Sequence, residues 1–269
     1  MLAVQRRGAI ISELERRGIV KVSELVDQLG VSDMTIRRDL SALERQGMLH
    51  KVHGGAVLYA EPSTSEPGFE AKSARRLAEK EAIAARAASL VAPGSAIAIS
   101  AGTTTHLFAR HLTDIPGLTV VTNSVWVADV LHRSGSDSVS VLLTGGLRTP
   151  SDALVGPIAI AALRSLHLDG VFMGVHGMDA YAGFSTPNLL EAETNRAMVR
   201  SARRLIVLAD STKWGVVGLS SMAELSEASM IVSDTGLSRT AVSALEEQVE
   251  DLLLVEPSRA LPQVSHHPN

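Results

Sequence analysis

Residues 31–55, VSDMTIRRDLSALERQGMLHKVHGG, predict the central helix of a small domain and the strands that follow it. Ser32 is suited to begin this helix, because a serine hydroxyl accepts an otherwise unpaired amide of the first turn. At about 100° per residue, Ile36, Leu40 and Leu43 lie on one side of the helix. They form an apolar stripe, which we expect to be buried against other helices.

The opposite side of this helix is polar and basic. Arg38, Ser41 and Arg45 fall there, and Thr35 and Arg37 flank it near the N-terminal end. A helix that reads DNA needs this division, because one side packs on the domain while guanidinium and hydroxyl groups on the other reach bases and phosphates. A three-helix unit with an ordinary solvated face is the alternative.

The flanking segments favour DNA binding. Residues 4–18 and 24–30 predict two helices before the central one, and the turn between the second and third is short. After it, MLHKVHGGAVLY predicts two short strands around Gly54–Gly55, a basic wing that carries Lys51 and His53. Together these features predict a winged helix-turn-helix.

The connector has a different composition. Residues 60–70 contain two prolines and a glycine and predict a flexible linker. The next segment is rich in Ala, Glu, Lys and Arg and predicts a helix over 71–92 that begins a second domain. Its basic cluster of Lys72, Arg75 and Arg76 is explained better by a solvated helix face than by DNA contact. The predicted parts are 1–59 (winged helix-turn-helix), 60–70 (linker), 71–257 (second domain) and 258–269 (disordered tail).

The second domain alternates short apolar runs with helical patterns. The runs that predict strands are SAIAIS (95–100), LTVVT (118–122), VSVLL (139–143), DGVFMGV (169–175), RRLIVLA (203–209), SMIVS (229–233) and DLLLV (251–255). Apolar strands separated by helices indicate a mainly parallel sheet with helices on both faces, so the predicted fold class is α/β.

Polar loops follow five of these strands: AGTTT, TNS, TGG, VHGMD and DSTKWG. In such sheets the ligand crevice lies at the carboxyl ends of the strands, where these loops converge. The loop Gly102–Thr105 offers backbone N–H groups and hydroxyls at a helix N-terminus, which suits an anion. Lys213 could supply the counter-charge. With Asn123 and the Gly145–Gly146 pair, these loops favour a phosphate-bearing ligand rich in hydroxyls.

The composition excludes several other classes of protein. The net charge is −4, but residues 1–60 carry nine Lys/Arg against seven Asp/Glu, so a mildly basic head precedes an acidic body. The absence of cysteine excludes a disulfide framework and suits a reducing cytoplasm. No signal peptide and no apolar run of membrane-spanning length is present, and the nine histidines show no metal-binding spacing. We expect a soluble cytoplasmic protein without cofactor or metal.

The N-terminal segment GIVKVSELVDQLGVSDMTIRRDLSALERQGMLHKVHGGAV resembles the helix-turn-helix of the DeoR family of sugar-metabolism repressors, with MTIRRDL and HGGA as its specific parts. The resemblance points to Thr35, Arg37 and Arg38 as the best candidate DNA contacts. The full set of candidates is Ser32, Thr35, Arg37, Arg38, Lys51 and His53.

The second domain resembles the DeoR sensor domain through GTTT, LTVVTNS, LLTGG, LVGP, GVHGMDAYAGFSTPNLLEAETNRAM and LIVLADSTKWG. The resemblance implies a fold similar to ribose-5-phosphate isomerase and a phosphorylated sugar as ligand. Ser100 departs from the family pattern, which has aspartate there, and this departure changes which ligand fits or weakens its binding. The candidate effector contacts are Gly102, Thr103, Thr104, Asn123, Gly145, Gly146, Gly177, Asp179, Glu191 and Lys213.

Other interpretations of the same residues stay open. Asp179, Glu191 and Lys213 are groups that a phosphosugar isomerase or transferase could use for proton transfer, with the head as an accessory module. Asp179 and Glu191 equally suit a turn cap and a helix cap. His176 lies in the VHGMD loop and belongs either to the pocket or to the loop structure alone. A degenerate pocket on a constitutive DNA-binding protein is a third interpretation.

The sequence therefore predicts a repressor of a carbohydrate-metabolism operon that a phosphorylated sugar releases from double-stranded operator DNA. We expect at least a homodimer, built mainly through the second domain, because helix-turn-helix proteins read paired half-sites. The effector would act through the helix predicted at 71–92, because that helix leads back to the linker.

Overall fold

The computed structural model describes the chain in six stretches: residues 3–45, 49–52, 54–58, 63–64, 68–135 and 138–257. Its contacts divide the chain into two units, Met1–Pro62 and Ser63–Asn269, and each is described by itself. Part of the predicted linker and the whole predicted tail at 258–269 lie outside the described residues. No described helix is long and apolar enough to cross a membrane.

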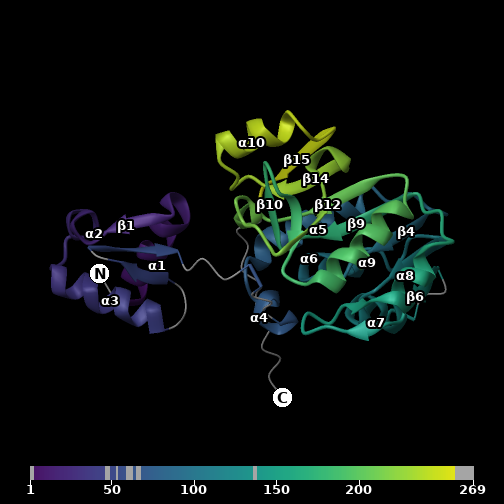
Figure 1. Ribbon diagram of the computed structural model, residues 1–269, viewed down its shortest axis with the longest axis horizontal. Coiled ribbons are helices and arrows are strands. Elements are labelled where there is room, and N and C mark those ends of the chain that lie inside the picture. Colours follow the sequence, from purple (N-terminus) through teal and green to yellow (C-terminus); the bar gives the residue numbers. More distant parts are fainter. Residues whose placement is uncertain are drawn as a thin grey trace, which may run out of the picture. The chain divides into compact units, whose positions relative to one another are not determined.

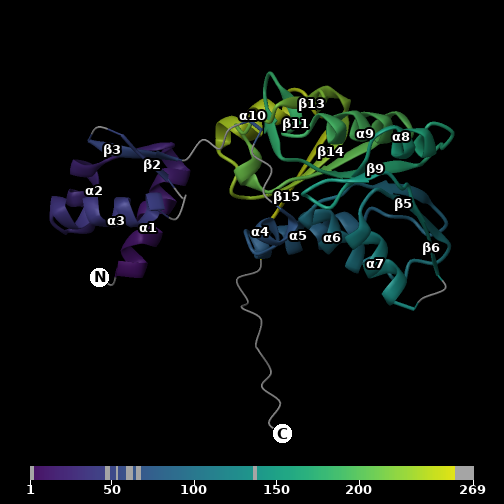
Figure 2. The same cartoon turned by 60° about the horizontal axis from the view of Figure 1, so that its bottom comes forward.

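The N-terminal unit is a helical domain with a small sheet (Figures 1 and 2). Its elements are α1 (Ala3–Arg17), β1 (Ile19–Lys21), α2 (Val22–Leu29), α3 (Asp33–Arg45), β2 (Leu49–Val52) and β3 (Gly55–Leu58). The strands pair antiparallel in the order β1-β3-β2, so the predicted wing is confirmed and gains a third strand. Ile36, Leu40 and Leu43 of α3 are buried, as the stripe predicts.

Gly55 is required by the pairing of β1 with β3. A Cβ atom at this position would lie 2.1 Å from the carbonyl oxygen of Val20. Gly54, in the turn, has φ +79°, which glycine adopts without strain. The HGG motif is thus explained by a tight turn followed at once by a close approach of two strands.

The second unit is built on a seven-stranded parallel sheet. Its strands are β4 (Ala96–Ile99), β5 (Leu118–Thr122), β6 (Val139–Leu143), β9 (Gly170–Gly174), β12 (Leu205–Leu208), β14 (Ala228–Asp234) and β15 (Asp251–Val255). All seven predicted strands are confirmed, and they line up in the order β15-β14-β12-β9-β4-β5-β6. The order reverses between β4 and β9, and in open α/β sheets that point opens a crevice for a ligand.

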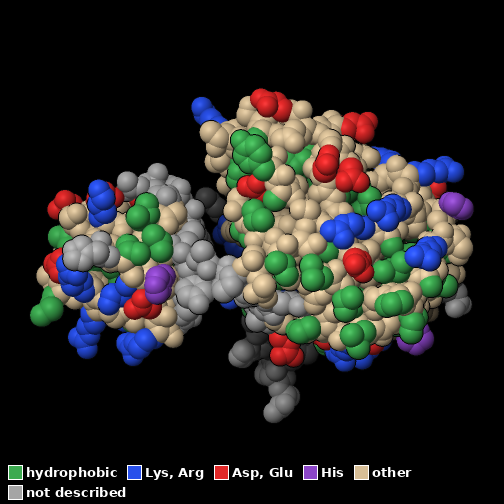
Figure 3. All heavy atoms as spheres, in the orientation of Figure 1, with side chains coloured by type: hydrophobic (Ala, Val, Ile, Leu, Met, Phe, Trp, Pro, Cys, Tyr) green, Lys and Arg blue, Asp and Glu red, His purple; other side chains and the backbone are tan. Residues whose placement is uncertain are grey.

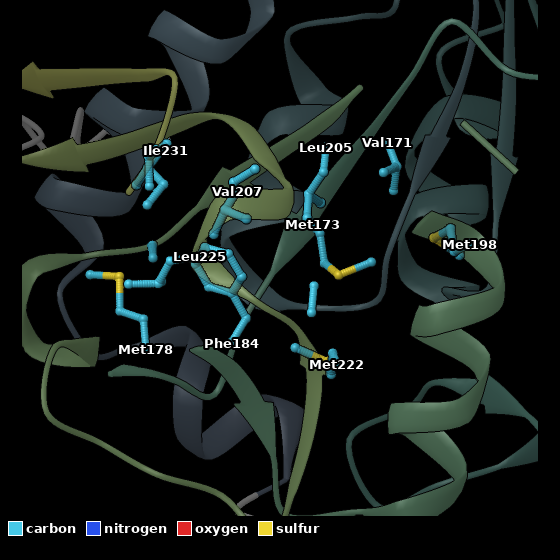
Figure 4. Packing of buried hydrophobic residues seen from close by; sticks show 14 of the residues in the cluster. Val171, Met173, Met178, Phe184, Met198, Leu205, Val207, Met222, Leu225 and Ile231 are labelled. Atoms are coloured by element: carbon cyan, nitrogen blue, oxygen red, sulfur yellow. The ribbon is translucent and has the colours of Figure 1, made fainter. Parts of the chain in front are cut away.

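Helices cover both faces of this sheet (Figure 2). The first face carries α5 (Leu77–Ala88), α6 (Thr103–Arg110) and α7 (Val125–Arg133), which share one buried cluster. The second carries α8 (Pro157–Leu163), α9 (Leu189–Arg200) and α10 (Arg239–Glu246). Figure 4 shows the packing on the second face, where Val207 and Met173 of the sheet meet Phe184 and Leu225. Both faces are thus closed by apolar contact, as a parallel sheet requires.

Two features differ from the predictions. The helix expected over 71–92 is broken into α4 (Phe69–Ser73) and α5, with Arg76 between them in the left-handed region at φ 54°. An antiparallel sheet of β10 (Gly177–Asp179), β11 (Gly183–Thr186) and β13 (Ser220–Ala223) was not predicted, nor was the pair β7 (Leu147–Arg148) and β8 (Leu154–Val155). These strands are too short to show a clear alternation of apolar and polar residues.

Candidate functional site

The outer face of α3 presents an unpaired arginine. Arg38 is exposed, and it has no hydrogen-bond or ion-pair partner in the part of the chain that the structure describes. The buried stripe on the other side of α3 holds the helix in place, so the Arg38 guanidinium points away from the core of the unit. It is free to bind an external acceptor.

The other candidate DNA contacts on α3 bind one another or their neighbours. The hydroxyls of Ser32 and Thr35 lie 2.9 Å apart, and the Thr35 amide donates to the Ser32 hydroxyl at 3.3 Å. Arg37 pairs with Asp33 one turn earlier, with Nε 2.5 Å from the carboxylate. These contacts order the first turn of α3 before any partner binds, which reduces the entropy lost on recognition.

The wing is tied to α3 by two hydrogen bonds. The Lys51 ammonium donates to the Ser41 hydroxyl at 2.9 Å, and the Lys51 amide donates to the Glu44 carboxylate at 2.9 Å. Wing and helix therefore form one surface that bears Lys51 and Arg38. His53, the other candidate on the wing, lies outside the described residues.

Asp39, which sequence reasoning did not single out, anchors α3 to α1. Its carboxylate is buried and accepts from Arg7 Nε at 2.9 Å and from Arg6 Nε at 2.5 Å. Burial alone would raise the pKa of Asp39, but the two arginines outweigh it and hold the pKa below its ordinary value. The sequence feature that could have identified Asp39 is the position of an acidic residue beside the apolar stripe of α3.

In the second unit, the loop after β4 lies at the point where the strand order reverses. Gly102 precedes α6, and the Thr105 hydroxyl donates to the Gly102 carbonyl at 3.0 Å. Ser100 is buried, and its hydroxyl accepts from the Gly174 amide of β9 at 3.0 Å. Ser100, where the family resemblance implies aspartate, therefore joins the two central strands at their carboxyl ends.

Asn123 holds two loops together. Its side chain is buried, accepts from the Ala101 amide at 2.9 Å and donates to the Leu154 carbonyl at 3.2 Å. Both ends of the amide are thus used inside the protein. Asn123 therefore positions the loop that begins α6.

Two of the candidate glycines, Gly146 and Gly177, lie where another backbone segment approaches closely. A Cβ on Gly177 would lie 2.0 Å from the carbonyl oxygen of Val216, and one on Gly146 would lie 2.5 Å from that of Val155. Gly145 has φ +71°. Each position therefore needs glycine for packing or for backbone conformation, whether or not it contacts an effector.

Asp179 has partners within its own turn, whereas Glu191 of α9 binds side chains from other segments. The Asp179 carboxylate accepts from the amides of Tyr181 and Ala182 at 2.9 and 3.1 Å, so it caps the turn between β10 and β11. Glu191 accepts from the hydroxyls of three side chains: Thr149 at 2.8 Å, Thr186 at 3.1 Å and Ser151. A direct role for either carboxylate in effector binding stays a prediction.

A cationic cluster surrounds the carboxyl end of β12. Lys213 ends the short helix Ser211–Lys213, and Asp210, which is buried, caps this helix by accepting from the Thr212 amide at 3.1 Å. Lys80 lies in the first turn of α5 and donates to the Lys72 carbonyl at 2.6 Å. Its ammonium is close enough to Asp210 and Lys213 to feel the charge of both.

Lys80 is buried, and this burial is the largest of the effects that lower its pKa to about 8. Asp210 raises the pKa, whereas Lys213, Lys72 and Arg75 lower it further. Sequence reasoning missed Lys80. The spacing of the residues could have predicted its burial, because Lys80 falls on the same side of α5 as the buried Ile83, Ala84 and Ala87.

An aromatic cluster joins α4 to α6 and α7. Phe69 of α4 stacks on Trp126 of α7 with ring centroids 5.0 Å apart, and it meets His106 of α6 edge-on at 5.5 Å. Trp126 also donates to the Asp152 carboxylate at 2.7 Å. His106 lies in the first turns of α6, which begins at Thr103 after Gly102, so a shift of the start of α6 would reach α4 through this cluster.

Two family models together match most of the chain. The DeoR-like helix-turn-helix domain matches residues 6–61, and the DeoR C terminal sensor domain matches residues 75–235. The uncharacterized HTH-type transcriptional regulator YgbI of Escherichia coli K12 is 38% identical over 95% of this chain and 99% of its own. A putative aga operon transcriptional repressor of Escherichia coli O157:H7 is 36% identical over 93% of both chains.

The likeness to solved structures is slight. Ribose 5-phosphate isomerase A from Neisseria gonorrhoeae has a TM-score of 0.37 and 14% identity, with 50% of this chain and 52% of that chain covered.

The sequence relatives are named as regulators. The protein is therefore a transcriptional regulator and not the phosphosugar isomerase or transferase that the sequence left as an alternative. The match of both domains and the relatives at full length show that the chain belongs to the DeoR family of helix-turn-helix transcriptional regulators.

Proposed function

We propose that the protein represses a carbohydrate-metabolism operon and that a phosphorylated sugar releases it from its operator. The observation that carries the effector part is the cationic cluster of Lys80 and Lys213 on the same strand-end edge as the Gly102–Thr105 loop. Ammonium groups and a helix N-terminus both attract phosphate. The relatives named for an aga operon and for a lactose phosphotransferase system support the carbohydrate part.

The strand order indicates the size of the proposed pocket. β12 and β4 are separated only by β9, and neighbouring strands lie about 4.8 Å apart. The cationic cluster and the loop after β4 are therefore roughly 10 Å apart across the end of β9. A phosphate held at one end leaves the hydroxyls of a small sugar within reach of the polar groups at the other.

The effector would act on the head through α4. A ligand that draws in the Gly102–Thr105 loop moves the start of α6, and His106 carries that movement to Phe69. The same ligand would bind Lys80, whose ammonium already donates to the carbonyl of Lys72 in α4. Both routes end on the helix that the chain enters directly from the linker, and the ligand favours whichever arrangement it binds more tightly.

The proposal is tested with labelled duplex DNA from the region upstream of the gene itself. The operator affinity is measured by fluorescence anisotropy with sugar phosphates, their unphosphorylated counterparts and inorganic phosphate. We expect at least one sugar phosphate to weaken binding by about 10- to 100-fold and the matching free sugar to have no effect. Release by the free sugar at the same concentration would contradict the phosphate site.

The first prediction concerns DNA recognition. Arg38→Ala should weaken operator binding by about 1–3 kcal/mol without unfolding the head, because Arg38 has no partner among the described residues whose loss would disturb the fold. Anisotropy gives the affinity, and circular dichroism checks the fold. Arg86→Ala, an exposed arginine of α5, is the matched control. Unchanged affinity of folded Arg38→Ala protein would remove this residue from the interface.

The second prediction concerns pH. Lys80 has a pKa of about 8, so it is mostly charged at pH 7 and mostly neutral at pH 9, whereas a phosphomonoester, with a second pKa near 6, stays dianionic. We expect the effector affinity to fall by up to about tenfold between these pH values, because binding then requires uptake of a proton. Calorimetry on the wild type and Lys80→Met measures this slope. An equal slope in the variant would show that Lys80 does not bind the phosphate.

A further inference from the structure

A large apolar side chain is exposed at the start of α3. Met34, the second residue of this helix, is 79% exposed. No other large apolar side chain in the described part of the N-terminal unit is as exposed. An isolated apolar residue is ordinary on a protein surface, so it is the position of Met34 that gives its exposure a meaning.

Met34 lies on the outer side of α3, next to Arg38. At about 100° per residue, both side chains point about 160° away from the buried Ile36 and only about 40° away from each other. They are four residues apart, which is about 6 Å along the helix axis. Figure 3 shows Lys and Arg side chains projecting from the part of the N-terminal unit where Figure 1 places α3. Met34 is therefore an apolar position within a basic surface.

The polar side chains next to Met34 already have partners. The hydroxyl of Thr35 lies 2.9 Å from that of Ser32, and Arg37 Nε lies 2.5 Å from the Asp33 carboxylate. These bonds order the first turn of α3 and leave Met34 uncovered. Its side chain is thus presented at the N-terminal end of the helix, and this is the end whose residues contact base edges when a recognition helix enters the major groove.

Methionine suits one base better than the others in the major groove. Thymine presents a C5-methyl group there, whereas guanine presents two acceptors, cytosine an amino donor, and adenine one of each. The methionine side chain is unbranched and polarisable, so it adapts its shape to a methyl group. It has no hydrogen-bond donor and only a weak acceptor, so against the other bases it would leave polar groups without partners. Thymine is therefore the base that Met34 favours.

We propose that Met34 is a specificity-determining residue that packs on the C5-methyl group of a thymine in the operator. The inference rests on the proposed function, in which α3 reads operator DNA. Base pairs are stacked about 3.4 Å apart, so the separation of about 6 Å along α3 places this thymine within about two base pairs of the base that Arg38 contacts. Arg38 favours guanine, because a guanidinium donates to both of its acceptors. Each half-site then carries a thymine and a guanine as near neighbours.

Uracil distinguishes this contact from a contact with the sugar-phosphate backbone. Uracil pairs with adenine as thymine does and differs from thymine only in lacking the C5-methyl group. A contact of Met34 with the backbone would also bury the side chain, but it would carry no sequence information and would not depend on this methyl group.

The experiment replaces each thymine of the operator with uracil, one at a time, and measures affinity by fluorescence anisotropy. The duplex comes from the region upstream of the gene or from selection in a random pool. For the wild type we expect at least one thymine per half-site at which uracil weakens binding by about 3- to 10-fold, because a buried methyl group is lost. Met34→Ala should bind the unmodified operator more weakly by a similar factor and show no uracil penalty at that thymine.

Four further measurements make the comparison specific. Met34→Leu keeps an apolar side chain and should retain the uracil penalty, whereas Met34→Gln, of similar length but polar, should lose it. Ile19→Ala removes an exposed apolar side chain from β1 of the same unit and should keep both the affinity and the penalty. Arg38→Ala should bind every duplex more weakly and keep the penalty, because Arg38 contacts a different base. Circular dichroism checks the fold of each variant.

Equal uracil penalties in the wild type and Met34→Ala at every thymine would overturn the inference. A loss of affinity in Met34→Ala that is the same for operator and unrelated DNA would do so too, because it would assign Met34 to the backbone. A wild type without any sequence preference would overturn the proposed function as well. The uracil scan is made without effector, so an effector that fails to release the operator leaves its result unchanged.

Discussion

Lys213→Ala is expected to bind operator DNA with wild-type affinity and to remain bound when the effector sugar phosphate is added. Lys213 lies in the sensor unit, beyond β12, so its loss leaves the surface of α3 and the wing unchanged. Charged hydrogen bonds to phosphate contribute about 1.5–3 kcal/mol each, so the effector affinity should fall by about 10- to 100-fold.

The measurement is an effector titration of the preformed complex with DNA, read by anisotropy for the wild type, Lys213→Ala and Lys213→Arg. The arginine variant keeps the charge and should recover part of the response, whereas Arg86→Ala should respond like the wild type. A wild-type midpoint in Lys213→Ala would show that Lys213 is not the phosphate anchor and that the strand-end pocket is wrong.

Gly177→Ala is expected to destabilise the sensor unit by at least about 3 kcal/mol. The new methyl group would lie 2.0 Å from the carbonyl oxygen of Val216 and 2.5 Å from its carbonyl carbon, and these are backbone atoms that cannot rotate away. Overpacking normally costs about 1–3 kcal/mol, and more where the backbone must move. The loss would reflect packing and not a lost effector contact.

Urea unfolding, followed in the full-length protein, measures this change in the free energy of unfolding. Gly174→Ala is the matched control, because a Cβ there meets its nearest neighbour at 3.7 Å, an ordinary van der Waals distance. Stability equal to that of the wild type in Gly177→Ala would contradict the close approach of β10 to the segment around Val216.

The seven strands of the large sheet were predictable because each is an uninterrupted apolar run between polar loops. Val171–Met173 and Leu205–Leu208 are examples, buried from both sides by helices. The same reasoning located the polar loops at the strand ends. It failed for β10, β11 and β13, whose three or four residues each are held by contacts with distant parts of the chain and not by a local pattern.

The break between α4 and α5 was not predictable from helix propensity. Residues 72–79, KSARRLAE, contain no glycine or proline and suit a continuous helix, yet Arg76 adopts a left-handed conformation at φ 54°. The break lets Phe69 reach Trp126 while Lys80 stays buried near Asp210. Contacts to two different places on the sensor unit thus override the local preference for one straight helix.

The sequence by itself determined the two folding units, the basic outer face of α3 and the parallel sheet with polar loops at its strand ends. Periodic burial and capping residues are local properties, and they can be recognised in the order of the amino acids. Only the tertiary structure decided that Ser100 and Asn123 hold the loops at the strand ends and that Lys80 lies near Lys213. Strand order decides each of these, because it sets which residues far apart in the chain become neighbours.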